Sequence, residues 1–427
     1  MNRRKFLGST AMAGAAAAAT ATSGPGRAAG SHGGESVKIG FLAPLTGDVA
    51  AWGLPGLYGC EIWAEKKNAE GGIEVGGQTY DVEIIAYDDE YLPEKARTGA
   101  QKLIQEDGVS FIEMLGGDTM PAVTPIANRA EMLVSTLLPS DLSPDTPFLV
   151  APAEVHPIYN VTGVWWLAEY MPEAKTAVIC AQDDALGRPS VATYLAAFEA
   201  HGIEVKDVIL FDVATTDFAP VMAAMLAHKP DILCLDTAYA EFVNALCKQA
   251  YVQDYSGQII SCTVDFYADI IANTSEAFME GVIFQFPDFD DPALNDARIN
   301  FAGPNSFFQT YNERYPGQWS AVSWEYASIL DLWLDGAQKA GSIEPAAVLE
   351  GMKSGGMGAH AFGEAQWWGK DLFGIDNALV GNWPVVQIQN GKAVIVEFKN
   401  IPDWWSEFGE VVIKRFEEMG EMWYQRA

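Results

Sequence analysis

Apolar residues recur along this chain in two alternating rhythms, starting at Val37. Short, nearly continuous apolar runs predict buried strands, and longer stretches with apolar residues three or four positions apart predict amphipathic helices. In the first series we expect strands over residues 37–42, 82–86, 110–114 and 133–137. Helices are expected between them, over the stretch that ends at Gly71-Gly72, around residues 96–104 and over residues 121–129. Strands alternating with helices in this way predict a parallel sheet with helices on both faces.

The same alternation then begins again. We expect strands over residues 176–180, 205–210, 232–235, 258–262 and 281–286, and helices over residues 187–201, 218–227 and 240–249. Further helices are expected over residues 307–314, 320–340 and 345–354, after a loop rich in Pro, Asp and Asn. Two similar series predict two α/β lobes, in which ligands bind beyond the carboxyl ends of the strands, near helix N-termini.

The end of the chain has a different pattern. Residues 383–389 and 392–398 flank Asn390-Gly391, which is a strong signal for a β-hairpin. Residues 402–427 predict an amphipathic terminal helix whose apolar face we expect to pack on the body of the protein rather than on a partner. That face carries Trp404, Trp405, Phe408, Val411, Val412 and Phe416.

The first 35 residues predict an export signal. Arg3-Arg4 stands before Phe6-Leu7, an alanine-rich stretch follows over residues 10–22, and a small-residue linker suited to cleavage covers residues 24–34. This order is typical of a twin-arginine signal peptide, and the stretch is shorter than the roughly 20 apolar residues that a membrane span needs. Because no cysteine follows the apolar stretch before Cys60, we expect a periplasmic protein without a lipid anchor.

The length of the chain indicates the number of domains, and its net charge indicates which partners it can bind. The 427 residues suit two domains. The net charge of −31 repels nucleic acid and anionic lipid. It predicts a solvated acidic surface, with a preference for cationic ligands as the alternative. Of the five cysteines, Cys180, Cys234 and Cys262 lie in or beside strand-like runs and are expected to be buried thiols.

The sequence shows no pattern typical of an enzyme. It has no Gly-x-Ser-x-Gly turn and no Walker phosphate loop, and its five histidines form no zinc pattern. We therefore expect a binding protein with no catalytic residue, no cofactor and no metal. His156 is the most interesting histidine, because it falls between the two strand–helix series.

Several segments resemble the periplasmic binding proteins of the leucine/isoleucine/valine transporter family. They include Ile39–Gly47, Tyr87–Asp89, Leu115–Thr119 and Lys229–Asp231, and the resemblance runs from Val37 to Phe398. It implies a type I fold, with two Rossmann-like lobes joined by a three-crossing hinge that closes on a ligand. Lobe 1 would then comprise residues 36–154 and 285–365, and lobe 2 residues 155–284 and 366–400. Residues 401–427 would form a C-terminal helical extension.

The resemblance also implies where a ligand would bind. Lobe 1 would contribute an aromatic wall, a polar loop and a carboxylate-holding loop, and lobe 2 the ends of its strands. The implied residues are Trp52, Gly117, Asp118, Thr119, Leu138 and Ser140 in lobe 1, Asp184, Leu186, Asp236, Tyr239 and Asp265 in lobe 2, and the late aromatic Trp324. Trp52 could instead cap the first helix, and Thr119 and Ser140 could be ordinary helix caps.

Several of these positions depart from the family pattern. Leu186 replaces an aromatic residue, and Thr263 replaces the acid that grips a ligand ammonium unless Asp265 takes its place. Asp118 puts a carboxylate where small hydroxyls usually donate to the ligand. Tyr91 and Leu115 stand where some members have a disulfide pair.

The resemblance implies a substrate-binding protein of an ABC importer. It would act as a monomer and deliver its ligand to a membrane permease, after export through the twin-arginine translocon. An amino acid or a related amine or amide is the expected ligand. The alternatives are a small aromatic or carboxylic acid as ligand, or a sensor of the same fold that serves a signalling partner.

Overall fold

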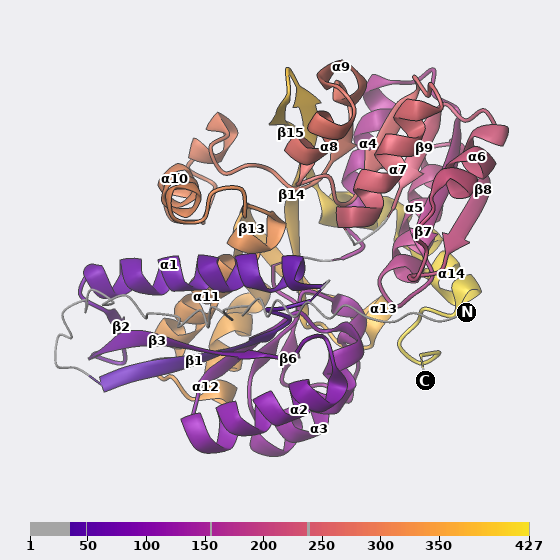
Figure 1. Cartoon of the computed structure of the whole chain (residues 1–427). Helices are drawn as coiled ribbons and strands as arrows, with labels where there is room; N and C mark the ends of the chain where they lie inside the picture. The colour runs from indigo at the N-terminus through magenta and orange to yellow at the C-terminus, as the bar shows by residue number, and fades with distance from the viewer. Residues whose placement is uncertain (1–34, 48, 154–155, 237–239, 427) are drawn as a thin grey trace, which may run out of the picture.

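The computed structural model describes residues 35–47, 49–153, 156–236 and 240–426. The export signal predicted in residues 1–35 therefore lies almost wholly outside the described residues, as does Tyr239. Figure 1 shows the described chain as two α/β lobes, one above the other, joined near the middle of the molecule.

Lobe 1 is built on a six-stranded sheet in which the first strand–helix series is mostly parallel. Its strands are β1 (Glu35–Ala43), β2 (Ile73–Val75), β3 (Gln78–Asp88), β4 (Phe111–Met114), β5 (Val134–Ser135) and β6 (Leu149–Val150). Their order is β2-β3-β1-β4-β5-β6, and β2 is antiparallel to β3. All four residues of β4 are buried, as expected for a strand covered on both faces.

The helices of lobe 1 lie on both sides of this sheet (Figure 1). They are α1 (Leu54–Ala69), α2 (Pro93–Lys102), α3 (Met120–Ala130), α10 (Pro304–Arg314), α11 (Ala321–Ala340) and α12 (Pro345–Lys353). α2 packs with α3, whereas α1 packs with α10 and α11, which come from the far end of the sequence.

Lobe 2 contains the second strand–helix series. Its strands are β7 (Thr176–Gln182), β8 (Glu204–Phe211), β9 (Ile232–Leu235), β10 (Gln258–Ser261), β11 (Ile283–Phe284) and the hairpin of β14 (Ala378–Gln389) and β15 (Lys392–Asn400). Its helices are α4 (Asn160–Tyr170), α5 (Gly187–Ala200), α6 (Ala219–Ala227), α7 (Ala240–Val252), α8 (Tyr267–Asn273), α9 (Glu276–Met279) and α14 (Ile401–Met419). β8, β7, β9, β10 and β11 pair in parallel, and β14 pairs antiparallel with β11. α4 and α14 pack against α5, and α6 and α8 pack against α7.

Strand β14 is itself one of the passages between the lobes. Its first residues pair with β13 (Gly363–Trp368), whose hairpin partner β12 (Met357–His360) packs on α11 and α12. Its later residues pair with β11 in lobe 2. The pairing of β14 thus places the third connection between the lobes within this strand. The boundary expected from the sequence, at residues 365/366, lies earlier in the chain. The first connection between the lobes begins after β6 and runs beside β14, since Ala151 forms a β-bridge with Ala378.

The long, strongly periodic elements agree with the sequence prediction, and the differences are local. The predicted strand over residues 133–137 shortens to β5, and the one over 281–286 shortens to β11. The predicted terminal helix ends at Met419, because Gly420 takes a left-handed conformation at φ 79°. The hairpin β12–β13 and helix α4 were not predicted.

The C-terminal segment reaches from lobe 2 back to lobe 1. α14 packs on α5, where the Trp404 indole N–H donates to His201 Nε2 at 3.0 Å. After α14, the Arg426 guanidinium donates to the backbone carbonyls of Ser140 and, at 3.3 Å, Leu142. The predicted packing of this extension on the body of the protein is confirmed.

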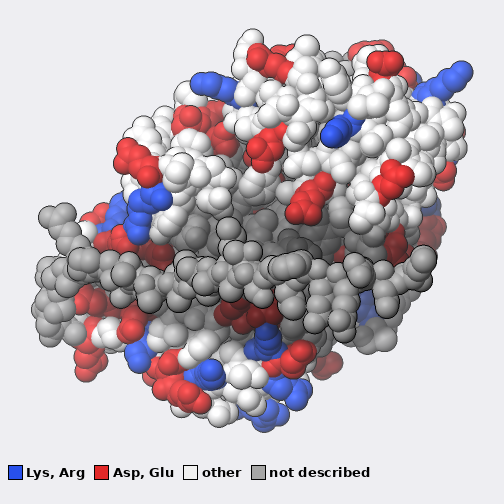
Figure 2. All heavy atoms as spheres, viewed as in Figure 1, with Lys and Arg blue, Asp and Glu red and all other residues white. Residues whose placement is uncertain are grey.

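The surface agrees with a solvated acidic shell. On the face shown in Figure 2, acidic side chains are scattered over both lobes and mixed with Lys and Arg, mainly on the lower lobe. All five cysteines are buried thiols. Within the part of the chain that the structure describes, no helix is long and apolar enough to cross a membrane.

Candidate functional site

A small cavity of about 30 Å³ lies between the two lobes. Its wall in lobe 1 consists of Val49, Trp52, Tyr91, Leu115, Leu137 and Leu138, and its wall on the other side consists of His156, Tyr159, Leu186 and Thr263. Apart from His156 and Tyr159, which lie between β6 and α4, these residues follow the carboxyl ends of β1, β3, β4, β5, β7 and β10, where open α/β sheets bind ligands. The space is small, and a larger groove with walls from both lobes adjoins it.

Trp52 separates this cavity from a larger outer groove. It ends the short 3₁₀ helix Ala50–Trp52, and its side chain is 8% exposed. Gly53 follows it because a Cβ there would lie 2.1 Å from the carbonyl oxygen of Pro44. The outer groove, of about 570 Å³, is lined by Val49 and Trp52 on one side and by the 213–218 loop and the start of α7 on the other. The indole therefore contributes to the walls of both spaces.

The polar loop of lobe 1 folds around a carboxylate of the protein itself. The Gly117 N–H donates to both oxygens of Asp141, at 3.2 and 3.0 Å, and the Thr136 hydroxyl donates to one of them at 2.6 Å. The Leu138 N–H in turn donates to Thr136 Oγ1 at 3.0 Å. Gly116 needs its φ of 95°, and a Cβ there would lie 2.1 Å from Asp141 Oδ2. Desolvation raises the pKa of Asp141 to about 7, although these two donors and Arg426 act to lower it.

Two aspartates hold helix N-termini at the cleft. Asp184 Oδ1 accepts from the N–H groups of Leu186 at 3.0 Å and Gly187 at 2.9 Å, at the start of α5. Asp265 accepts from the Ala321 N–H at 3.0 Å, so an acid of lobe 2 caps a helix of lobe 1. Burial raises the pKa of both carboxyls, that of Asp265 to about 6.

His156 joins two residues of the wall that lies opposite lobe 1. Its Nε2 lies 3.0 Å from the Leu186 carbonyl oxygen, and its Nδ1 lies 3.2 Å from the Tyr159 hydroxyl. Burial lowers the pKa of His156 to about 4, which leaves a neutral imidazole at neutral pH.

The structure brings some of the residues implied by the resemblance to the cavity and not others. Trp52, Leu138 and Leu186 line it, and Gly117 lies beside Tyr91 and Leu138. Asp118 is exposed at the rim, where its N–H lies 3.4 Å from the Tyr91 hydroxyl.

Other implied residues face inward, away from the cavity. The buried Thr119 hydroxyl donates to the Gly116 carbonyl at 3.0 Å. Ser140 is half-buried, and its carbonyl accepts from Arg426. Trp324 is fully buried and stacks on Phe289 at 5.0 Å.

Asp236 is also inside lobe 2. It is 1% exposed, and its Oδ1 accepts from the Ser190 hydroxyl at 2.7 Å and from the Cys262 thiol at 3.2 Å.

Several residues of the cavity wall were not among those that the resemblance implied. For some of them, the sequence had already marked the position as unusual. Tyr91, Leu115 and Thr263 were recognised as departures from the family pattern, and His156 as the histidine between the two series. All four line the cavity. The sequence did not mark Tyr159, Leu137 and Val49 in this way.

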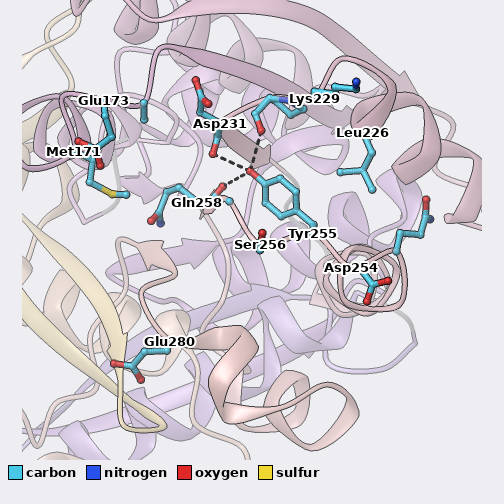
Figure 3. Close-up of a pocket in the computed structure, with 14 residues that line it drawn as sticks. Met171, Glu173, Leu226, Lys229, Asp231, Asp254, Tyr255, Ser256, Gln258 and Glu280 are labelled. Carbon is cyan, nitrogen blue, oxygen red and sulfur yellow. Dashed lines mark hydrogen bonds between the residues drawn. The ribbon is translucent and has the colours of Figure 1, made fainter.

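A larger depression lies at the opposite end of lobe 2 and is a poor candidate for the ligand site. It measures about 670 Å³ and surrounds Tyr255, Asp231 and Gln258, at the amino ends of β9 and β10 (Figure 3). The Tyr255 hydroxyl lies 2.9 Å from the Asp231 carbonyl oxygen and 3.0 Å from that of Gln258. These groups stabilise a loop, and parallel sheets bind ligands at the other end.

Comparison with known proteins agrees with this architecture. The model of a family described as periplasmic binding protein matches residues 36–393. The chain belongs to this family. The match covers both lobes and ends within β15, so α14 and the C-terminal segment of this periplasmic binding protein lie outside it.

Individual relatives confirm the resemblance seen in the sequence. A Leu/Ile/Val-binding protein homolog of Brucella abortus is 28% identical over 199 residues, which is 44% of this chain and 47% of the relative. The alignment thus spans about half the length of that protein. Among solved structures, a leucine-binding protein from Thermotoga maritima has a TM-score of 0.68 at 19% identity, covering 86% of this chain and 99% of that one. A solute-binding protein of an ABC transporter from R. palustris, in complex with 4-hydroxybenzoate, has a TM-score of 0.66 at 19% identity, covering 87% and 99%. These structures share the two-lobed type I fold.

The buried acid of lobe 2 should make the stability of this periplasmic binding protein depend on pH. Burial raises the pKa of Asp236 to about 7, against about 3.9 in an unfolded chain. Its contribution is therefore fully present below about pH 4 and is lost as the pH rises through about 7. The total loss amounts to about 4 kcal/mol. We expect the free energy of unfolding in urea to fall between pH 5 and pH 8.

The variant Asp236→Asn keeps the size of the side chain and removes its titration. We expect a clearly smaller fall for this variant over the same pH range. An identical fall in both proteins would contradict the assignment to Asp236.

Proposed function

We propose that this protein is the substrate-binding component of an ABC importer, exported by the twin-arginine route and acting unanchored in the periplasm. It captures a small polar molecule, an amino acid or a related amine or amide, between its lobes and delivers it to a membrane permease. It acts as a monomer and performs no chemistry on its ligand. The observation that carries the proposal is the cavity at the carboxyl ends of both sheets, which is walled by Trp52 and Leu138 on one side and by Leu186 on the other.

Walls from two lobes support a hinged mechanism of capture. The inner cavity, of about 30 Å³, is smaller than an amino acid, so we propose that opening of the hinge enlarges it. A ligand that contacts walls from both lobes binds the closed form better than the open form, and this difference in affinity favours closure.

The walls support a ligand with an apolar body and a few polar groups. Trp52, Leu138 and Leu186 would contact the body, and Asp118 and Asp184 lie near it as acceptors. We propose that Gly117, Thr119, Ser140, Asp236, Asp265 and Trp324 support these walls from behind; Tyr239 remains a predicted contact.

Small aromatic acids are the alternative ligands. The R. palustris protein with 4-hydroxybenzoate favours them, as does the aromatic lining from Trp52, Tyr91 and Tyr159.

A thermal-shift screen against amino acids, amides, polyamines and aromatic acids tests the proposal. A true ligand should raise the melting temperature in a concentration-dependent way, because binding stabilises the folded state by about 2.7 kcal/mol at 100 times its dissociation constant. Mass spectrometry of the recovered ligand checks that it is unchanged. Conversion of the ligand to a product would contradict a binding-only role, and a screen without hits would contradict these ligand classes.

A further inference from the structure

We infer that this cleft excludes carboxylates and selects a neutral or cationic amine or amide with an apolar body. The reason is that three of the protein's own aspartates already accept from backbone N–H groups of the glycine loop and of two helix starts, namely those of Gly117, Leu186, Gly187 and Ala321. The inference rests on the proposed function, since it names the ligand class of that same site.

The first of these aspartates acts in lobe 1. Glycine loops that follow a strand present N–H groups to anions, and here the Gly117 N–H points at Asp141, with 3.2 and 3.0 Å to its two oxygens. The Thr136 hydroxyl, which also lies in this loop region, donates to the same carboxylate at 2.6 Å. A ligand carboxylate at this position would have to displace Asp141 from both donors.

The Leu138 N–H, which the family resemblance assigns to a ligand carboxylate, also has an internal acceptor. It donates to Thr136 Oγ1 at 3.0 Å, and that hydroxyl donates on to Asp141. The carboxylate-holding loop is thus closed on itself by a chain of hydrogen bonds. Arg426 reinforces this closure from the C-terminal segment, because its guanidinium is bound to the carbonyls of Ser140 and Leu142 on either side of Asp141.

The second aspartate acts in lobe 2. The N-terminus of α5 points toward the cavity, where Leu186 lines the wall. Asp184 accepts from the N–H groups of both Leu186 and Gly187. The helix end that would otherwise attract an anion therefore carries a fixed negative group.

The third aspartate acts between the lobes. Asp265 accepts from the Ala321 N–H at the start of α11, at 3.0 Å. Helix α11 is 20 residues long, and its N-terminus would be a strong anion site if it were open.

The described walls of the cavity also carry no cation. None of their residues is Lys or Arg, and burial keeps His156 neutral. On segments next to the cleft, Arg188 is paired with Asp183 at 2.6 Å, and Arg426 is bound to backbone carbonyls. A ligand carboxylate would therefore lose its water without gaining a counter-charge, with only neutral donors such as the Tyr91 and Thr263 hydroxyls on the walls. It would also be repelled by Asp118, Asp141 and Asp184.

An amine or an amide would fit the same cleft, because it donates hydrogen bonds and carries no negative charge. Its N–H groups are donors, and acidic rim groups such as Asp118 are acceptors. Its apolar body would contact Trp52, Leu138 and Leu186. The ligand class that fits the arrangement is an aliphatic or aromatic amide or amine without a free carboxylate.

Matched ligand pairs test this inference on the unmodified full-length protein. Isothermal titration calorimetry at pH 7.5 would compare leucine with leucinamide and isopentylamine, and benzoate with benzamide and benzylamine. We expect the members without a carboxylate to bind about tenfold more tightly, or better, than their partners. A carboxylate that binds equally well or more tightly would overturn the inference and leave the proposed function intact.

Two asparagine variants locate the cause of the preference. Asp141→Asn removes the charge and adds an amide donor beside Gly117, so we expect it to reduce the preference against the carboxylate several-fold. Asp231→Asn is the matched control, because Asp231, like Asp141, accepts from backbone N–H and a threonine hydroxyl, but at the far end of lobe 2. Its donors are two backbone N–H groups and the Thr176 hydroxyl, at 2.9 Å each. An equal effect of both variants, or none from Asp141→Asn in a folded protein, would overturn the role of Asp141.

The ligand pairs keep the inference testable even if Asp141→Asn does not fold. If none of the six compounds binds a protein that is folded by circular dichroism, the proposed ligand classes fail, and the inference fails with them. That result differs from the one in which only the carboxylates bind, which contradicts the inference alone.

Discussion

Replacing Trp52 with alanine should raise the dissociation constant of the ligand by about a hundredfold, which corresponds to about 3 kcal/mol. The indole lines the inner cavity and the outer groove at once, so its loss both removes a wall from the ligand and opens the cavity to water. Isothermal titration calorimetry with the best ligand of the screen measures the effect. We expect the melting temperature of the unliganded protein to change little, because opening of the proposed hinge would expose this side chain, which is 8% exposed here.

Trp165→Ala is the matched control for this variant. Trp165 lies on α4 in lobe 2, where its indole N–H donates to Glu169 at 2.6 Å, outside the cavity. Its loss should leave the dissociation constant unchanged. If Trp52→Ala strongly lowers the unliganded melting temperature while the affinity stays the same, Trp52 is a core residue and not a ligand wall.

The second large effect is expected at Trp383, where Trp383→Ala should lower the free energy of unfolding by about 3–5 kcal/mol. This indole is 1% exposed and donates to the Gln285 carbonyl at 2.9 Å. Its ring packs on Tyr159 at 5.2 Å and on Phe362 at 5.4 Å. The cavity left by the substitution would thus separate segments from all three crossings. Urea unfolding followed by circular dichroism measures the loss.

Trp367→Ala provides the comparison. Trp367 also donates its indole N–H to a carbonyl, that of Met352 at 2.9 Å, but it is only half-buried. Its substitution should cost clearly less. Equal losses for the two variants would mean that the aromatic cluster at the crossings does not stabilise the protein beyond an ordinary contact.

Much of the fold could be predicted because its main elements have a strong period of their own. The strand of residues 232–235 was predicted with the bounds of β9, since a fully buried parallel strand is apolar at every position. α4 was missed because residues 160–170 are apolar on more than one side and show no two-sided pattern. β12 and β13 were missed because their pairing depends on β14 and on packing against α11 and α12, which are distant in sequence.

Part of the site could be predicted from the family resemblance, which assigned Trp52, Leu138 and Leu186 to a ligand. Each lies in a loop after a strand, and all three line the cavity. Asp265 could not be placed from the sequence, because its partner is the N–H of Ala321, 56 residues later. The side chain of Asp236 turns inward to a serine and a cysteine from two other segments. Such choices depend on packing between elements, which a single sequence does not display.

The position of β14 and α14 in the sequence decides when this protein can fold during synthesis. β11 has its second strand neighbour only in β14, and α5 receives part of its cover only from α14, which ends a few residues before the chain does. Lobe 1 also depends on a segment that is made late, since its helix α1 packs on α11. As the chain leaves the ribosome from its N-terminus, most of lobe 2 is made before the segments that complete it. An emerging chain therefore carries an open strand edge at β11 until β14 has been made, and an uncovered face of α5 until α14 has been made.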